Sequence, residues 1–305
     1  MEISSVIRYY HRTHQRVETE QVYGEAWLNW AYRTLPGRLL TRHLFSKQWV
    51  SRIFGVFEDS PLSRSKIDDF ILKYRIDMEE FETTVYSNFN QFFIRKFKDG
   101  KRPFVSDTGT FCAGAEARYL VFESLKSKQT FPVKGIEIDL GILLQDAEIA
   151  KEFECGTLIL ARLCPVDYHR FHFPFEGNLI RHTRVSGEYH SVNPAAFEAE
   201  PKVFLKNERQ VAILESPVFG KVAMIEVGAL GVGKIVQSAY SPLDAMPVKF
   251  ARGAEKGYFL FGGSTVIWLV QNGKLKLSRD LVENSARNLE TWVPLGQALG
   301  ERPDA

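Results

Sequence analysis

Two glycines and a serine near the C-terminus, Gly262, Gly263 and Ser264, stand between two apolar runs with the composition of β-strands. Glycine adopts backbone angles that other residues avoid, so a Gly-Gly pair here indicates first of all a bend. The arrangement also suits chemistry. The small Gly263 lets the serine hydroxyl approach the preceding carbonyl carbon, and a strained turn distorts that amide. The bond between Gly263 and Ser264 is therefore a candidate for self-cleavage.

A second group of reactive side chains lies far upstream, in the segment DYHRFHFP at residues 167–174. His169 and His172 are three residues apart, and imidazoles titrate near neutral pH, which suits proton transfer. In a strand the two rings would point to opposite faces, whereas a turn or helix would let them converge. Two unrelated surface histidines are the alternative. No metal is expected, because no third ligand stands at a recognisable spacing.

The elements that would position these groups are short apolar runs, which dominate the chain from Phe104 onward. Each run has the length and the β-branched or aromatic content of a strand, and one helical interruption is expected at 140–153. Many short strands in a stretch of this length predict a sandwich or a partly open barrel. The expected strands are 117–122, 157–163, 211–214, 221–227, 234–238, 258–261, 265–270 and 274–277.

The region before this β-rich body has a helical pattern over residues 1 to about 60. Apolar residues recur three or four apart from Trp27 and Trp30 onward, and cations such as Arg33 and Arg38 stand between them. Tryptophan and arginine on one amphipathic helix suit a bilayer surface, where the rings lie at the headgroup level and the cations meet anionic phosphates. Packing of the apolar stripe against the protein's own core is the alternative.

The predicted fold class is α+β, with a helical, membrane-facing cap at residues 1–100 and a β-rich catalytic body at 101–305. The 305 residues are 45% hydrophobic and 25% charged, as in ordinary globular proteins. A net charge of +2 points to no nucleic-acid partner. No run approaches the roughly 18 to 20 apolar residues that span a bilayer, so a protein acting on lipid would lie on the membrane. The three cysteines share no metal-ligand spacing, and their odd number argues against a disulfide framework.

Together the two reactive segments resemble the phosphatidylserine decarboxylase family of the bacterial type. That family's histidine motif has a proline, an Asp-Tyr-His and an Arg-x-His in this order, which the chain matches between Arg162 and Gly177. The Gly-Gly-Ser sequence, with AEKGYF at 254–259 before it, is similar to the family's cleavage site. The resemblance runs from about residue 89 to 295. It implies an enzyme that makes its own cofactor by cutting its chain before a serine.

By this resemblance, a base removes the hydroxyl proton of Ser264, and the acyl group shifts from nitrogen to oxygen. The ester then breaks by β-elimination and leaves a covalent pyruvoyl group, with loss of ammonia. The mature protein would have a large subunit, 1–263, and a small subunit, 264–305. The pyruvoyl ketone would form a Schiff base with the amine of phosphatidylserine, and loss of carbon dioxide would give phosphatidylethanolamine. His169 is the implied general acid and His172 the implied maturation base, although the sequence alone does not separate the two roles.

One maturation residue of the family differs in this chain. The family has an aspartate in a Pro-Ala-Asp-Gly segment, and alignment from the strand at 119–122 puts Glu116 at its position, without the proline and the glycine. A glutamate can orient a histidine as an aspartate does, but its extra methylene moves the carboxylate. Glu116 is therefore the expected orienting carboxylate.

The function predicted on these grounds is that of a pyruvoyl-dependent phosphatidylserine decarboxylase, peripheral to the cytoplasmic side of the cell membrane. Its partners would be phosphatidylserine in an anionic membrane and two subunits cut from one precursor, and a homodimer is left open. An alternative from another class is a non-processing homologue that serves as an anionic-lipid-binding scaffold, which the substitution at Glu116 keeps open. A pyruvoyl decarboxylase of a soluble amino acid is a third reading, which the aromatic and cationic N-terminal region disfavours.

Overall fold

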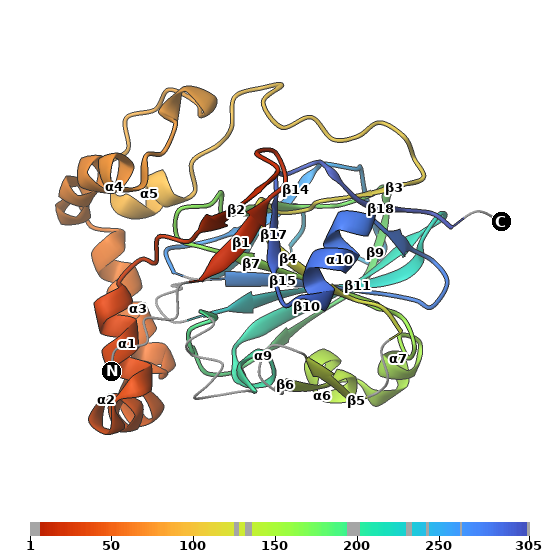
Figure 1. The fold of residues 1–305 in the computed structure, drawn as a ribbon, viewed down its shortest axis with the longest axis horizontal. Coiled ribbons are helices and arrows are strands. Elements are labelled where there is room, and N and C mark those ends of the chain that lie inside the picture. The colour runs from red at the N-terminus through yellow and green to blue at the C-terminus, as the bar shows by residue number, and fades with distance from the viewer. Residues whose placement is uncertain are drawn as a thin grey trace.

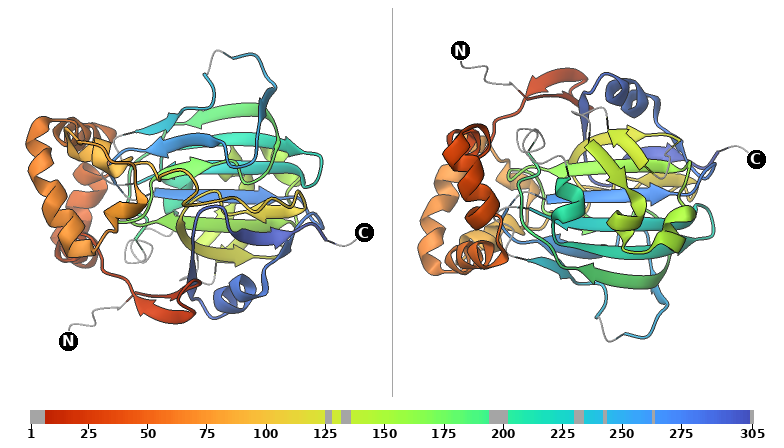
Figure 2. Two further views of the ribbon diagram at one scale, coloured as in Figure 1. Left: turned by 90° about the horizontal axis from the view of Figure 1, so that it is seen from above. Right: turned by 90° about the horizontal axis from the view of Figure 1, so that it is seen from below.

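The N-terminal helices gather at one end of a β-rich body, as Figures 1 and 2 show from three directions. The α+β fold class is therefore confirmed. Gly263, one side of the predicted cleavage site, lies outside the residues that the structure describes. This computed structural model describes residues 7–124, 128–131, 136–193, 202–229, 234–241, 244–262 and 264–303.

The first described residues form a β-hairpin of β1 (Arg8–His11) and β2 (Arg16–Thr19). The helical prediction was wrong here, because helical spacing of apolar residues begins only at Trp27. Strand β1 instead pairs in parallel with β17 (Glu290–Val293) and so extends the main sheet at its edge. The hairpin thereby joins the N-terminus of the chain to a segment close to its C-terminus.

The helical region follows the hairpin. Thr34 separates its first two helices: its backbone N–H closes the first on the Trp30 carbonyl, and its hydroxyl accepts a hydrogen bond from Gly37 N (3.1 Å) at the start of the second. The helices are α1 (Glu25–Arg33), α2 (Leu35–Leu40), a π-helical turn (Thr41–Phe45), α3 (Gln48–Glu58), α4 (Lys66–Tyr74) and α5 (Phe89–Phe93), with 3₁₀ turns at Pro61–Ser65 and Met78–Glu80.

Polar contacts fix this region to the body. Lys47 Nζ lies 2.6 Å from the Glu188 carboxylate, and Gln48 Nε2 donates to the Gly187 carbonyl (2.8 Å). The backbone N–H of Tyr189 donates to the carbonyl of Ser46 (2.8 Å). The start of α3 is thus anchored to one loop of the body.

Within the described residues, the body is built on one mixed sheet of ten strands, in the order β13-β9-β10-β11-β15-β7-β4-β17-β1-β2. Its inner strands β11, β15, β7 and β4 are buried almost throughout, as continuous apolar runs predict. The other seven strands of this sheet are β13 (Val248–Phe250), β9 (Gly177–Val185), β10 (Arg209–Ser216), β11 (Gly220–Gly228), β15 (Ser264–Val270), β7 (Thr157–Leu163) and β4 (Ala117–Phe122).

Smaller sheets complete the body, and the main core cluster includes side chains from the ten-stranded sheet and from β8 (Arg170–His172) and β14 (Glu255–Phe259). In the part of the chain that the structure describes, the strands form no closed barrel, so the body is a layered, open arrangement. The smaller sheets are β12 (Ile235–Gln237) with β14 (Glu255–Phe259) and β8 (Arg170–His172); β16 (Lys276–Leu277) with β18 (Ala298–Glu301) and β3 (Thr110–Cys112); and β5 (Lys128–Phe131) with β6 (Ile136–Asp139). The body's helices are α6 (Leu140–Leu144), α7 (Ala147–Lys151), α9 (Val203–Lys206) and α10 (Arg279–Ala286).

Candidate functional site

Ser264 is the first residue of β15, an inner strand of the large sheet. It pairs with Gly228 on β11 and with Leu163 on β7, so strands flank it on both sides. Its side chain is fully buried, and its Oγ has no hydrogen-bond partner among the described residues. Burial of an unpaired hydroxyl costs about 1–3 kcal/mol, so such a group calls for an explanation, and a reactive role is one.

The backbone that leads into β15 is fixed at two points. The N–H of Phe259 donates to the carbonyl of His169 (2.9 Å), and the N–H of Phe261 donates to Asn90 Oδ1 (2.8 Å). Gly262 then has φ 141°, which L-residues with a side chain rarely adopt. The glycine of the sequence motif is therefore required by the bend itself, whatever chemistry follows.

His169 lies beside this bend and is fully buried. Its Nδ1–H donates to the carbonyl of Asp167 (2.9 Å), so Nε2 carries the free lone pair, and Nε2 has no partner that meets hydrogen-bond geometry among the described residues. Burial lowers the pKa of His169 to about 3; the backbone of Asp167 and Gly262 opposes this shift, and the positive charge of Arg95 adds to it. The ring packs on Phe93, with centroids 3.9 Å apart. His169 is therefore a neutral base in a buried site.

Acidification is expected to destabilise the fold partly through His169. Its folded-state pKa lies below the ordinary 6.5, so the unfolded chain gains a proton that the folded chain does not, and stability present above pH 6.5 is lost as pH falls toward 3. One such site costs about 2 kcal/mol between about pH 6.5 and about pH 5. Urea denaturation at both pH values measures the free energy of unfolding. The Ser264→Ala chain is used because it is expected to remain uncleaved. Adding His169→Asn should reduce the difference in unfolding free energy between the two pH values. An unchanged difference would contradict the burial of a neutral His169 ring.

His172 is half-buried, at the far end of β8 from the bend. Its Nδ1–H donates to the carbonyl of Gly253 (2.8 Å), and its Nε2 lies 3.4 Å from the hydroxyl of Tyr168. Burial lowers the pKa of His172, so this ring is neutral as well. The strand register thus brings His169, but not His172, next to the residues that lead into Ser264.

Glu116 lies in a segment that packs directly on β8. The N–H of His172 donates to the carbonyl of Gly114 (2.7 Å), where an added Cβ would meet the carbonyl oxygen of His172 at 2.6 Å. The carboxylate of Glu116, however, accepts hydrogen bonds from Arg102 Nε (2.6 Å) and from Leu295 N (3.4 Å). The segment therefore sits beside a motif histidine, while its carboxylate is engaged by an arginine.

The side chain of Asp167 fixes the loop that orients His169. Its Oδ2 accepts hydrogen bonds from Arg118 Nη1 (2.6 Å) and from Cys164 N (2.7 Å). All of these side chains are buried. Because the Asp167 carbonyl holds the Nδ1–H of His169, the ion pair with Arg118 stabilises the tautomer with a free Nε2.

A buried arginine connects three distant parts of the chain. Arg162 on β7 donates to Glu20, just after the hairpin (Nη2 to Oε2, 2.6 Å), and to Glu290 on β17 (Nε to Oε1, 2.8 Å). Sequence reasoning missed both carboxylates, because neither stands in a motif. If the chain is cut before Ser264, the pair between Arg162 and Glu290 joins the two fragments.

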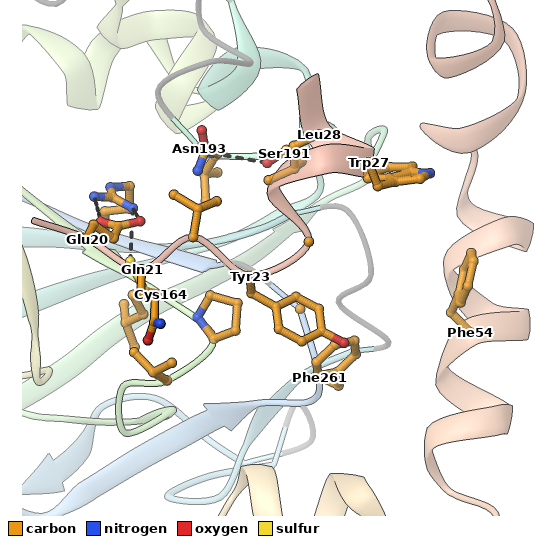
Figure 3. Close-up of a pocket in the computed structure, with 18 of the residues that line it drawn as sticks. Glu20, Gln21, Tyr23, Trp27, Leu28, Phe54, Cys164, Ser191, Asn193 and Phe261 are labelled. Carbon is orange, nitrogen blue, oxygen red and sulfur yellow. Dashed lines mark hydrogen bonds and ion pairs between the residues drawn. The ribbon is translucent and has the colours of Figure 1, made fainter. Parts of the chain in front are cut away.

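A cavity of about 420 Å³ opens between the helical region and the body (Figure 3). Its lining includes Gly262, two residues before Ser264, and Leu163, the partner of Ser264 on β7. Figure 3 shows Tyr23 and Phe261 side by side in it. Trp27 and Phe54 approach it from the helices. The lining is Glu20, Gln21, Val22, Tyr23, Gly24, Trp27, Leu28, Phe45, Phe54, Glu58, Lys66, Arg162, Leu163, Cys164, Pro165, Val166, Ser191, Val192, Asn193, Phe261 and Gly262.

Comparison with known proteins adds independent evidence. Phosphatidylserine decarboxylase proenzyme from Clostridium botulinum strain Kyoto is 38% identical to the chain over 299 residues, which cover 97% of this chain and all of that protein. The proenzyme of the same description from Ruminiclostridium cellulolyticum is 37% identical over 297 residues, with 97% of each chain covered. The one from Desulfitobacterium hafniense is 38% identical over 299 residues, covering 97% of this chain and 99% of its own.

The family model described as phosphatidylserine decarboxylase matches residues 89–301. This range agrees with the resemblance read from the motifs and includes the bend, both motif histidines and Glu116. Full-length identity and the family match lead to one conclusion. The chain belongs to the phosphatidylserine decarboxylase family of pyruvoyl-dependent carboxy-lyases.

Proposed function

We propose that this chain is a proenzyme that converts Ser264 into its pyruvoyl group, and that the mature protein decarboxylates phosphatidylserine. One observation supports this bend as the place of the reaction. Two fully buried polar atoms, Ser264 Oγ and His169 Nε2, lack hydrogen-bond partners among the described residues, and they lie at the same bend of the chain. Atoms left unpaired in this way have free capacity for a proton transfer.

Maturation requires a base for the hydroxyl of Ser264. A neutral imidazole accepts the proton, Oγ bonds to the carbonyl carbon of Gly263, and the C–N bond of the peptide breaks. Loss of the Cα proton of the serine then breaks its Cβ–O bond and leaves a carboxylate on Gly263. Hydrolysis of the resulting enamine releases ammonia. We assign the base to His172, as the family motif implies, and keep His169, whose backbone bonds to the bend, as the second candidate.

A pyruvoyl group at position 264 fits its surroundings, because the site is small and fully buried, and Gly262, two residues before it, lines the cavity. When present, the group supplies a carbonyl that accepts the electron pair left by departing carbon dioxide. We propose that His169 donates the proton that takes the place of carbon dioxide on the product carbon. Because its ring is neutral in the folded chain, it takes up a proton before it donates one.

Glu116 remains the proposed orienting carboxylate. Its segment contacts β8 at His172 through Gly114. Since its carboxylate oxygens bond to Arg102 and Leu295, the contribution to His172 would come from the position of this segment.

The cavity supports a lipid substrate. Its lining is mostly apolar, which suits the glycerol and acyl part of a phospholipid, and it includes Gly262, two residues from the position where the headgroup amine would have to react. Lys66 is a cation in the lining, paired with the Glu58 carboxylate at 2.6 Å. We propose that the headgroup enters past Lys66 towards Gly262.

The helical region supports attachment to the surface of the membrane. Among the described residues, no helix combines the length and the apolar character needed to cross a bilayer. Instead, the helices expose many large apolar side chains, with Arg38 and Arg42 exposed nearby. We propose that this face lies on the cytoplasmic side of the cell membrane, with apolar groups in the interface and cations on anionic lipid. The exposed set is Trp27, Trp30, Leu35, Leu39, Leu40, Trp49, Ile53, Phe54, Val56, Phe57, Leu62 and Leu72.

Replacing Trp49 and Ile53 with serine is expected to weaken binding to phosphatidylserine vesicles about tenfold or more. The two side chains are 54% and 61% exposed on α3, and neither lines the cavity, so the change removes apolar area from the interface and leaves the site intact. Vesicle co-sedimentation measures binding. Ile142→Ser is the matched control, since Ile142 is 48% exposed on the body. If the Trp49/Ile53 variant binds vesicles as tightly as Ile142→Ser, this face of the helical region is not the membrane-binding surface.

The proposed activity is tested by supplying the purified protein with phosphatidylserine vesicles and, separately, with free serine. Release of carbon dioxide from the lipid alone is expected. Activity on serine without lipid would favour the soluble-substrate reading. An uncleaved chain that binds vesicles without activity would favour the scaffold. Assembly into a homodimer is a further proposal, which sedimentation of the mature protein would test.

A further inference from the structure

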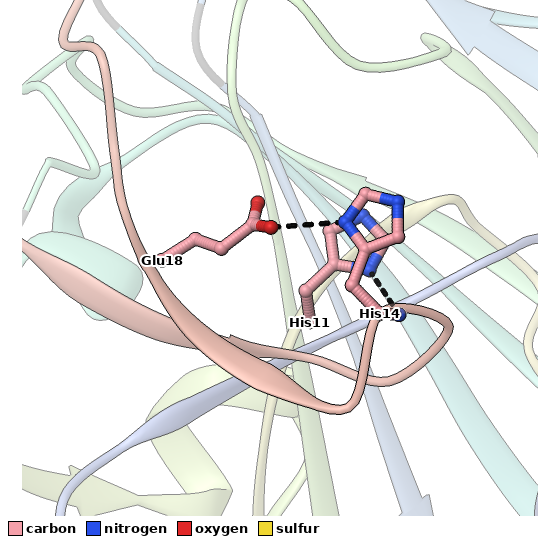
Figure 4. A group of neighbouring side chains, drawn as sticks. All are labelled: His11, His14 and Glu18. Atoms are coloured by element: carbon pink, nitrogen blue, oxygen red, sulfur yellow. Dashed lines mark hydrogen bonds and ion pairs between the residues drawn. The ribbon is translucent and has the colours of Figure 1, made fainter.

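Three metal-binding side chains meet on the N-terminal hairpin, far in sequence from the cleavage site. His11 closes β1, His14 lies in the turn, and Glu18 lies on β2 (Figure 4). One possible ligand atom from each lies within 4.8 Å of the other two. Among the described residues, this is the one group of three or more such side chains with that spacing.

The three side chains favour one class of metal ion. Two imidazoles and one carboxylate suit a borderline divalent ion such as Zn²⁺, which binds such atoms at about 2.0–2.2 Å. In a tetrahedral site these ligand atoms would be roughly 3.3 Å apart. The present separations of at most 4.8 Å therefore require only side-chain movement. His14 is exposed, while His11 and Glu18 are half-buried, so such movement is sterically available.

Two features of the free hairpin have to change for an ion to bind. The rings of His11 and His14 are stacked, with centroids 3.7 Å apart, and one ion cannot lie in the planes of both, so the exposed His14 ring must rotate. Glu18 Oε1 accepts hydrogen bonds from Arg16 Nε (2.7 Å) and from His14 Nδ1 (2.9 Å). The side chain of Arg16 is 70% exposed and can move into solvent.

We propose that His11, His14 and Glu18 form a binding site for one divalent transition-metal ion, with Zn²⁺ as the best fit and the fourth position open to water. The backbone supports the site, because the antiparallel pairing of β1 with β2 fixes the distance between the first and third ligands. Because the site lies on the hairpin that pairs with β17, metal binding is expected to stabilise this part of the fold.

The hairpin is tied to the C-terminal part of the chain. The His11 ring contacts Trp292 of β17 (centroids 4.3 Å apart), and Arg12 forms an ion pair with Asp280 (2.7 Å). An ion would lock the hairpin in the conformation that holds β17. If the chain is cut before Ser264, the ion would strengthen the contact between the two fragments, but binding itself does not depend on that cut.

Titration calorimetry of ZnCl₂ into chelator-treated full-length protein tests the site. One equivalent is expected to bind, and His14→Gln should weaken binding by at least about tenfold. His43→Gln, at an exposed histidine outside the cluster, should bind as the wild type does. Arg16→Ala should bind more tightly, because it removes a competitor for Glu18.

Co²⁺ provides a second readout, since tetrahedral nitrogen and oxygen ligands give it visible absorption that should disappear in Glu18→Gln. Circular dichroism of each variant shows whether the fold is kept. Absence of saturable Zn²⁺ binding by the wild type would overturn the proposal. Binding of Zn²⁺ by the double variant His11→Gln/His14→Gln with the affinity of the wild type would overturn the proposal as well. Loss of decarboxylase activity in the wild type would leave these results unchanged, so the site is tested separately from the proposed function.

Discussion

Ser264→Ala is expected to give one band of 305 residues on a denaturing gel, whereas the wild type is expected to give fragments of 263 and 42 residues. The variant lacks the hydroxyl that attacks the preceding carbonyl, so neither the cut nor the pyruvoyl group can form. Decarboxylation should fall to the uncatalysed rate, a loss of about 10⁶-fold or more. Removal of one buried oxygen without a hydrogen-bond partner should leave the fold intact.

The neighbouring Thr265 provides a matched control. It is also fully buried, and its hydroxyl also lacks a hydrogen-bond partner among the described residues. Thr265→Ala is therefore expected to cleave and to decarboxylate nearly as the wild type does. Cleavage of Ser264→Ala, or failure of Thr265→Ala to cleave although it folds, would mean that the hydroxyl of Ser264 is not the specific nucleophile.

His169→Ala is expected to cleave its chain but to lose about 10²- to 10⁴-fold in decarboxylation, the usual contribution of a positioned acid or base. His172→Ala is expected to remain uncleaved. A gel reports the cut and carbon dioxide release reports the reaction, so the two readouts separate the roles. The exposed His43→Ala should behave as the wild type in both.

The position of His169 also explains the opposite result, in which His169 and not His172 is needed for cleavage. Because the backbone of His169 bonds to Phe259, just before the bend, His169 is also placed to act on Ser264. If His169→Ala stays uncleaved while His172→Ala is cut, the two assignments must be exchanged. If both variants cleave and decarboxylate normally, neither imidazole serves this chemistry.

Much of the β-rich body was predictable, because buried inner strands are read from apolar runs alone. The expected strands at 117–122 and 157–163 coincide with β4 and β7. The hairpin at Arg8–Thr19 was not predictable in this way, since β1 is stabilised by pairing with β17, nearly the whole chain away. Strand β9, with four consecutive polar residues at 181–184, gives no continuous apolar run and was missed for that reason.

The site was predictable where a motif carries it and not where tertiary structure does. Ser264 and His169 stand in recognisable patterns, and the structure brings their neighbours together through the pairing of Phe259 with His169. Asn90, which holds Phe261, stands in no such pattern, because its role depends on α5 packing against the bend. The pairing of Glu116 with Arg102 is likewise a contact that only the folded chain defines.

Intact-mass measurement of the active protein tests the central claim most directly. We expect two fragments, residues 1–263 and a 42-residue fragment that begins at position 264 and is lighter by one ammonia than a fragment starting with serine. That mass reports both the position of the cut and the pyruvoyl group. Active protein with the bond between Gly263 and Ser264 intact, or a small fragment that keeps an N-terminal serine, would contradict the account.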